Sequence, residues 1–211
     1  MLKLNNPEAG SREHGYVRAA LEGGSLIVVP TDTIYGLAAR AFDEAACKRL
    51  YEVKGREATR PTAVLFPSLD DLADTLNERS RRARIACEAL LPGPVTLIIG
   101  NTGKAVPWLC GETPEKIGVR VPDNAMDLPP LAATSANFAG DVEISRLSDL
   151  PPEFYGEIAC AVDRGELPAG NASTVIDITA WEASGDIADI HVLRDPVDRA
   201  AELVGRLAKI S

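Results

Sequence analysis

Hydrophobic and polar positions follow one another along this chain in blocks that predict strands and helices in turn. Predominantly apolar runs at 25–30, 95–100 and 117–121 are typical of buried strands. Shorter apolar runs predict further strands at 62–66, 131–134, 157–162, 174–178 and 187–193. Apolar residues at helical spacing predict a first helix at 11–22 and a closing helix at 195–210.

Residues that cap helices mark three more helices within the chain. Asp43 is a candidate N-cap, and Gly55 stands where a left-handed residue would end the same helix. Ser68 and Ser80 begin the other two. Strands and helices therefore interleave at irregular spacing. The pattern predicts a single α/β domain over residues 1–211, with a twisted mixed sheet flanked by helices.

The composition is that of a globular protein with an acidic balance. The chain has 211 residues, a net charge of -9 and an isoelectric point of about 4.8. Such a chain is a poor general binder of nucleic acid, because phosphate contacts need clustered lysine and arginine, although a local basic groove is compatible with this total.

The cysteines and the lengths of the apolar runs indicate the cellular compartment of the protein. The 4 cysteines are dispersed without a CxxC pair, which disfavours a zinc site and favours reduced thiols in a cytosolic protein. The N-terminus lacks the apolar core of a signal peptide, and no run reaches the length of a membrane-spanning helix. We therefore expect a cytoplasmic protein with no membrane partner.

Several common catalytic motifs are absent from the sequence. The chain has no GxxxxGKS/T phosphate loop, no GxGxxG fingerprint, no GxSxG elbow and no HExxH. Its two histidines, His14 and His191, fall on a predicted helix and near a strand end, where a packed or surface role is the simpler interpretation. An enzyme of this sequence is expected to act through cations, hydroxyls and a metal that arrives with its substrate.

The segment VVPTDTIYGL places polar side chains directly after a buried strand. Thr31, Asp32 and Thr33 follow Pro30, and Tyr35 comes shortly after them. These residue types suit either a capped turn or the floor of a pocket for a small polar anion.

Cations and small polar residues gather near other predicted element ends. Lys54 ends a helix, where a cation complements the helix dipole, and Arg56 and Arg60 follow it. Ser135 and Asn137 of the segment TSAN are turn formers or ligand contacts. Taken one at a time, these residues are explained by local structure.

Arg120 is the most informative single charge, because it lies in an apolar run. A buried guanidinium needs an anionic partner, which is either an internal carboxylate or a bound ligand. Lys116, Ser173 and Arg194 flank this and other strands. Because ligands in open α/β sheets bind outside strand ends, the set together favours a substrate that carries phosphates and a carboxylate.

In their order and spacing these segments resemble the YrdC-like family of threonylcarbamoyl-AMP synthases. The resemblance rests on PTDTIYGL, YEVKGR, LPGPVTLII, GVRVPD, TSAN, STVID and LR, and it extends from about residue 25 to residue 194. It implies a YrdC-like α/β fold around a deep, positively charged cavity. It also implies a nucleotidyltransferase that makes threonylcarbamoyl-AMP and pyrophosphate from L-threonine, bicarbonate and ATP. Mg²⁺ would arrive with the ATP, and a downstream tRNA-modifying transferase complex would pass the threonylcarbamoyl group to an adenosine of tRNA.

The resemblance implies a role for individual residues of this chain. Catalytic roles are implied for Lys54, Arg56, Ser135 and Asn137. Threonine contacts are implied for Thr33, Arg120, Ser135 and Ser173. ATP contacts are implied for Arg56, Arg60, Lys116, Asn137, Ser145 and Arg194. No protein ligand to a metal is implied.

Parts of the chain depart from the family pattern and keep alternatives open. The segment DVEIS after TSAN lacks the common Ser-Pro-Thr, and Leu-Arg-Asp-Pro replaces the common Leu-Arg-Pro-Gly. One alternative is a non-catalytic protein of the same fold that binds double-stranded RNA or tRNA. Another is a single-domain relative of unsettled activity. A carbamoyl transferase of this fold would normally carry zinc-finger parts, and the sequence has no such motif.

Overall fold

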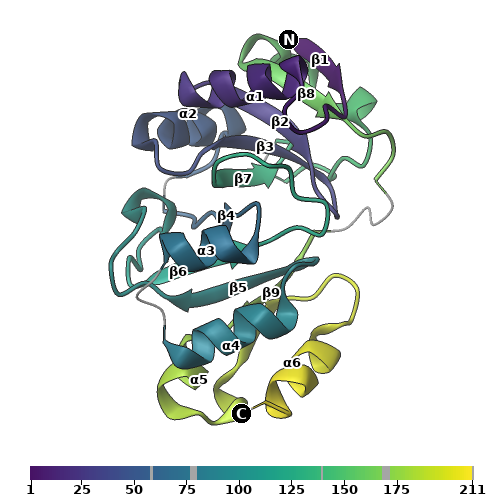
Figure 1. The fold of residues 1–211 in the computed structure, drawn as a ribbon. Helices are drawn as coiled ribbons and strands as arrows, with labels where there is room; N and C mark the ends of the chain where they lie inside the picture. Colours follow the sequence, from purple (N-terminus) through teal and green to yellow (C-terminus); the bar gives the residue numbers. More distant parts are fainter. Residues whose placement is uncertain (58, 77–79, 139, 168–171, 211) are drawn as a thin grey trace.

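The computed structural model describes residues 1–57, 59–76, 80–138, 140–167 and 172–210. Within these residues the strands form one ten-stranded sheet that extends through the length of the molecule (Figure 1). In chain order the strands are β1 (Leu2–Asn5), β2 (Leu26–Pro30), β3 (Tyr35–Arg40), β4 (Val64–Leu65), β5 (Val95–Gly100), β6 (Lys116–Arg120), β7 (Leu131–Ser135), β8 (Ile158–Asp163), β9 (Thr174–Asp177) and β10 (His191–Arg194).

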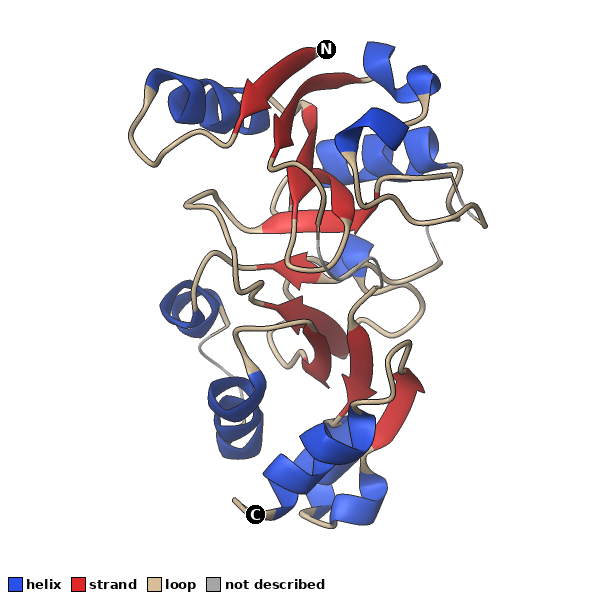
Figure 2. Ribbon diagram, turned by 90° about the vertical axis from the view of Figure 1, so that its right-hand side faces the viewer, coloured by secondary structure: helices blue, strands red, loops and turns tan. Residues whose placement is uncertain are grey.

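The sheet is mixed, as the irregular spacing of elements predicts. Its strand order is β1-β8-β2-β3-β7-β4-β6-β5-β9-β10. The pairs β1–β8, β8–β2, β4–β6 and β5–β9 are parallel, whereas the other neighbouring pairs are antiparallel. Figure 2 shows the strands following one another along the long axis with helices on both sides. The predicted α/β class with a mixed sheet flanked by helices is confirmed.

The first four helices begin where the sequence places cap residues. Ser11, Asp43, Ser68 and Ser80 each accept a hydrogen bond from the backbone N–H three residues later, which satisfies a donor that the first helical turn leaves free. Gly55 follows the second helix in the left-handed conformation, with φ of 64°. The helices are α1 (Arg12–Glu22), α2 (Glu44–Lys54), α3 (Leu69–Thr75), α4 (Arg81–Leu90), α5 (Thr179–Ser184) and α6 (Ala200–Ala208).

The central strands have one face packed in the hydrophobic core and an opposite face that no helix of the described chain covers at the cavity. Leu97 and Ile99 of β5 and Ile117 and Val119 of β6 belong to the main hydrophobic cluster, which also contains apolar residues of α4 and α5. Positions 96, 98, 116, 118 and 120 alternate with these residues and line a cavity on the opposite face. The two-residue period of a strand therefore separates the helix-covered core from a surface that is available to a ligand.

The strand expected at 187–193 is shorter than predicted. Ile187–Asp189 form a 3₁₀ turn, in which the Asp186 side chain accepts a hydrogen bond from the N–H of Ala188. The strand β10 begins only at His191. The prediction was wrong over the first residues because a local side-chain cap competes there with strand pairing.

The closing helix also begins later than the expected residue 195. Asp195 accepts hydrogen bonds from the N–H groups of Arg199 and Ala200, and α6 starts at Ala200. Strands β1 and β3 and helix α5 are additional to the predicted elements. Strand β3 pairs with β2 on one side and β7 on the other, so tertiary pairing defines it more than its own sequence does.

Two further findings concern the cysteines and the length of the apolar helices. The cysteines are all buried, and Cys47 and Cys87 belong to the main hydrophobic cluster, as their positions on predicted helices indicate. No helix in the described part of the chain is long and apolar enough to cross a bilayer.

Candidate active site

A cavity of about 490 Å³ opens over the free face of the central strands. This volume falls in the range of small-molecule sites in proteins. Mid-strand residues such as Thr96, Gly118 and Val175 line it together with residues at strand ends. The sequence pointed to residues at or near the ends of predicted elements and to none of these mid-strand residues. Among the residues with an implied role, those that line this cavity are Thr33, Arg56, Lys116, Arg120, Ser135, Ser173 and Arg194.

The cavity is kept open by a small residue in the middle of β6. A Cβ atom at Gly118 would lie 3.2 Å from the Cβ of Ala63 and 3.7 Å from Cγ2 of Thr96. A larger side chain at this position would therefore press on the neighbouring strands or occupy the cavity. Lys116 and Arg120 are two residues away on either side, so they lie on the same face of the strand as Gly118.

Arg120 has an internal partner and also lines the cavity. Its Nη2 forms an ion pair with Oδ1 of Asp32, and the two side chains are 8% and 9% exposed. The same nitrogen donates a hydrogen bond to Oγ1 of Thr33 at 3.0 Å. Burial lowers the pKa of the Arg120 guanidinium, and the charge of Asp32 opposes that effect. Of the two alternatives for Arg120, the internal ion pair is present, and it fixes Arg120 and Thr33 together on the cavity wall.

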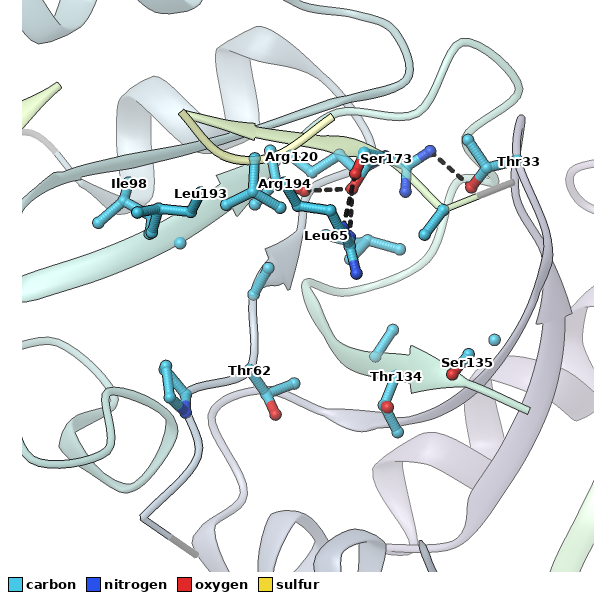
Figure 3. Close-up of a pocket in the computed structure, with 18 of the residues that line it drawn as sticks. Thr33, Thr62, Leu65, Ile98, Arg120, Thr134, Ser135, Ser173, Leu193 and Arg194 are labelled. Carbon is cyan, nitrogen blue, oxygen red and sulfur yellow. Dashed lines mark hydrogen bonds between the residues drawn. The ribbon is translucent and has the colours of Figure 1, made fainter. Parts of the chain in front are cut away.

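Arg194 organises a second group of polar side chains on the same wall. Its Nε donates to the carbonyl oxygen of Ser173 at 2.9 Å, and its Nη2 donates to Oγ of Ser173 at 3.1 Å. Oγ of Ser173 lies 2.8 Å from Oγ1 of Thr96. Figure 3 shows Arg194 and Ser173 near Arg120 and Thr33, with Thr62, Thr134 and Ser135 across the hollow.

Lys54 lies behind the cavity rather than on its lining. It is the last residue of α2 and is 3% exposed. Its Nζ donates to the carbonyl oxygen and Oγ of Ser135 at 2.5 and 3.2 Å, and to Oδ1 of Asn137 at 2.9 Å, with a further short contact to the Asn137 carbonyl. Burial and then the charge of Arg56 lower the pKa of Lys54 to about 8. Lys54 therefore holds the end of β7 and the residues that follow it.

Arg56 reaches the cavity because Gly55 turns the chain after α2. Its Nη2 donates to the carbonyl oxygen of Pro61 at 2.7 Å, and its Nη1 lies 3.4 Å from Oγ1 of Thr134. Burial lowers the pKa of the Arg56 guanidinium, Tyr51 raises it, and the nearby cations Arg60 and Arg194 lower it further.

The remaining predicted residues differ in their relation to the cavity. Lys116 lines it and pairs with Asp177 at 2.8 Å. Asn137 is buried and serves as an acceptor for Lys54. Arg60 is exposed and Ser145 is half-buried, and neither lines the cavity in this structure. The ATP contacts implied for Arg60 and Ser145 stay predictions.

Several lining residues were not singled out from the sequence. They are polar residues at positions that look like ordinary strand or turn: Thr62, Thr96, Thr134, Glu143 and Asp177. A usable signal exists for Thr96, because it interrupts an apolar run at a position that alternates with buried Leu97. Glu143 carries no such signal, because its segment has no regular period.

No cluster of histidine, cysteine or carboxylate side chains suited to a metal ion occurs among the described residues. Within the part of the chain that the structure describes, the charged groups that line the cavity are four cations, Arg56, Lys116, Arg120 and Arg194, and two carboxylates, Glu143 and Asp177. The cavity therefore offers cations and hydroxyls to a ligand, as the sequence pattern predicts.

Comparisons with known proteins point to one protein family. The family model Sua5/YciO/YrdC, described as telomere recombination, matches residues 19–191. The threonylcarbamoyl-AMP synthase of Pyrococcus abyssi is 35% identical over 174 residues, which cover 79% of this chain and 50% of the relative. The human threonylcarbamoyl-AMP synthase is 34% identical over 177 residues, which cover 76% of this chain and 61% of the relative.

A solved structure supports the same relationship. P. abyssi Sua5 complexed with L-threonine has a TM-score of 0.80 and 29% identity, over 98% of this chain and 62% of that chain. The chain thus spans 50% and 61% of the length of the two curated relatives. Because the family model matches most of the chain and both relatives exceed 30% identity, the chain belongs to the Sua5/YciO/YrdC family.

Proposed function

We propose that this chain is a threonylcarbamoyl-AMP synthase, which joins L-threonine, bicarbonate and ATP into threonylcarbamoyl-AMP and releases pyrophosphate. The observation that carries the proposal is the convergence of distant residues on one cavity. Thr33, Arg56, Arg120, Ser173 and Arg194 come from separate segments and line the same hollow. The names of the relatives support the same activity.

The chemistry explains why this cavity contains cations and hydroxyls. The amine of threonine combines with bicarbonate to give a carbamate, and water is released. A carbamate oxygen then attacks the α-phosphorus of ATP, and pyrophosphate leaves. Carboxylate, carbamate and triphosphate must come close together, and fixed positive charges offset their mutual repulsion and the charge that develops in the transition state.

The proposed threonine subsite is the wall that holds Thr33, Arg120 and Ser173. Arg120 is a donor for the substrate carboxylate, and its ion pair with Asp32 fixes its position. The hydroxyls of Thr33 and Ser173 are already oriented by Arg120 and Arg194, so they bind a small amino acid at little cost in side-chain entropy.

The proposed phosphate contacts are Arg56, Lys116 and Arg194. Mg²⁺ enters as part of the ATP substrate and neutralises phosphate charge. Lys54 is a positioning residue, because its ammonium is occupied by the oxygens of Ser135 and Asn137. The product would be used by a separate tRNA-modifying transferase complex, and we propose a cytoplasmic location for the reaction.

The test is pyrophosphate release with ATP and single amino acids, with and without bicarbonate. The wild-type chain is expected to release pyrophosphate only when threonine and bicarbonate are both present. Arg56→Ala and Lys54→Ala are expected to lower turnover by about tenfold or more, since each removes charge-assisted contacts. Lys48→Ala is the matched control, because Lys48 is an exposed cation on the same helix as Lys54. Unchanged turnover in both Arg56→Ala and Lys54→Ala would contradict the assignment.

A further inference from the structure

Glu143 is a carboxylate on the lining of a cavity that otherwise presents mainly cations. It lies in the segment between β7 and β8, and its side chain is half-buried. The next residue, Ile144, is 7% exposed, and its carbonyl oxygen accepts a hydrogen bond from the N–H of Tyr35 at 3.1 Å. This anchor on β3 fixes the backbone beside Glu143, and the Glu143 side chain lines the cavity from there.

The other carboxylates on the cavity lining or directly behind it already have cationic partners. Asp177 pairs with Lys116 at 2.8 Å, and Asp32 pairs with Arg120. Glu143 forms no ion pair or hydrogen bond with any other residue that the structure describes. It is therefore the carboxylate of the cavity that is available to a ligand.

The charge of Glu143 acts on two cations that hold residues of the cavity wall. Burial and Arg56 lower the pKa of Lys54, and Glu143 opposes this. Burial also lowers the pKa of Arg194, and Glu143 again acts in the opposite direction. Arg194 holds the proposed threonine contact Ser173, and Lys54 holds Ser135, for which the resemblance implies a threonine contact, so the charge of Glu143 acts on both holding side chains.

A free amino acid presents two opposite charges to such a cavity. Its carboxylate is attracted by Arg120, but its ammonium is repelled by every cation on the lining. This ammonium is the group of the proposed substrates that needs an anionic partner. Bicarbonate is an anion, and ATP is bound with its Mg²⁺. A half-buried carboxylate without an internal partner meets that need.

We propose that Glu143 binds the ammonium group of the amino-acid substrate and takes up the proton that this group must lose when the carbamate forms. The proposal rests on the proposed function and adds to it a residue that selects for an amine. In the step, R–NH3⁺, HCO3⁻ and the Glu143 carboxylate give R–NH–COO⁻, H2O and the Glu143 carboxylic acid. The C–N bond forms, a C–O bond of bicarbonate breaks, and the proton of Glu143 returns to solvent after the product leaves.

The test compares Glu143→Gln, which keeps the size and removes the charge, with Glu143→Asp, which keeps the charge. Glu143→Gln is expected to raise the KM for threonine about tenfold or more and to leave the KM for ATP within about twofold, since it removes a charge-assisted contact to the amino acid alone. Glu143→Asp is expected to recover part of the loss. Calorimetry with the substrate analogue 2,3-dihydroxybutanoate, in which a hydroxyl replaces the amine, measures the selection directly. The wild type is expected to bind threonine more tightly than this analogue, and Glu143→Gln to lose most of that preference.

Asp141→Asn is the matched control. Asp141 is exposed, does not line the cavity, and acts on the pKa of Lys54 in the same direction as Glu143. If Asp141→Asn reproduces the effect of Glu143→Gln, or if Glu143→Gln raises the KM for ATP instead, the inference is overturned while the proposed function stands. If the wild type shows neither threonine-dependent pyrophosphate release nor threonine binding, the proposed function and the inference are both overturned.

Discussion

Lys54 is expected to make the stability of this protein rise with pH in the alkaline range. Its ammonium lies inside the protein against oxygens of Ser135 and Asn137, and its pKa is lowered from 10.5 to about 8 by burial and then by Arg56. Below pH 8 the folded and unfolded states both carry the proton, and the cost of burying the charge is fully present. Between about pH 8 and pH 10.5 the folded state has lost the proton and the unfolded chain still holds it. Because the unfolded state then binds more protons, the free energy of unfolding increases with pH across this window.

The magnitude follows from the size of the shift. A lowering from 10.5 to about 8 corresponds to about 3 kcal/mol between the two ends of the window. For a domain of this length, 1 kcal/mol changes the melting temperature by about 2–4 °C. The variant Lys54→Met removes the titrating group, so it is expected to lack this gain in stability.

Urea unfolding at closely spaced pH values from 7 to 11 measures the effect. The quantity of interest is the unfolding free energy of the wild type minus that of Lys54→Met, because titrations common to both proteins cancel in the difference. This difference is expected to rise by about 3 kcal/mol across the window. Lys48→Met is the control, since Lys48 lies on the same helix and is exposed, and it is expected to follow the wild type. A difference that stays flat or falls with pH would contradict this prediction. It would show that the oxygen partners favour the buried ammonium at least as much as burial penalises it.

Three further predictions concern the cavity. Gly118→Val is expected to abolish threonine-dependent pyrophosphate release while the chain stays folded, because its side chain would meet Ala63 or fill the cavity; full activity would show that the cavity is not the site. Asp32→Asn is expected to lower the unfolding free energy by about 3–5 kcal/mol in urea titrations, because it leaves the Arg120 guanidinium buried without its charged partner; a change below about 1 kcal/mol would contradict this. Arg194→Ala is expected to raise the KM values for both ATP and threonine, since Arg194 lines the cavity and also holds a threonine contact; a change in neither would remove it from the site.

The parts of the fold that could be predicted from the sequence are those with local causes. The N-caps Ser11, Asp43, Ser68 and Ser80 act on backbone groups three residues away, so the starts of four helices follow from neighbouring residues alone. Strand β5 has the predicted bounds, because its apolar run ends at the irregular segment that follows. Strand β3 contains Gly36 and small residues of low strand propensity, and its conformation depends on partners at 26–30 and 131–135.

The same distinction applies to the site. Arg120 could be singled out because it lies in an apolar run, and Arg56 and Arg194 because they follow the ends of predicted elements. The hydroxyl of Thr96 lies 2.8 Å from that of Ser173 only because β5 pairs with β9, and that pairing is not contained in either segment. The sequence therefore favoured a type of ligand. The order of strands in the sheet was needed to identify further lining residues such as Thr96.

A crystal structure of this chain grown with L-threonine and a non-hydrolysable ATP analogue would locate both substrates. We expect both ligands in the one cavity, with the amino acid beside Thr33, Arg120 and Ser173. The phosphates are expected against Arg56, Lys116 and Arg194. Ligands bound at separate places on the surface, or a saturated crystal with neither ligand in the cavity, would contradict this arrangement.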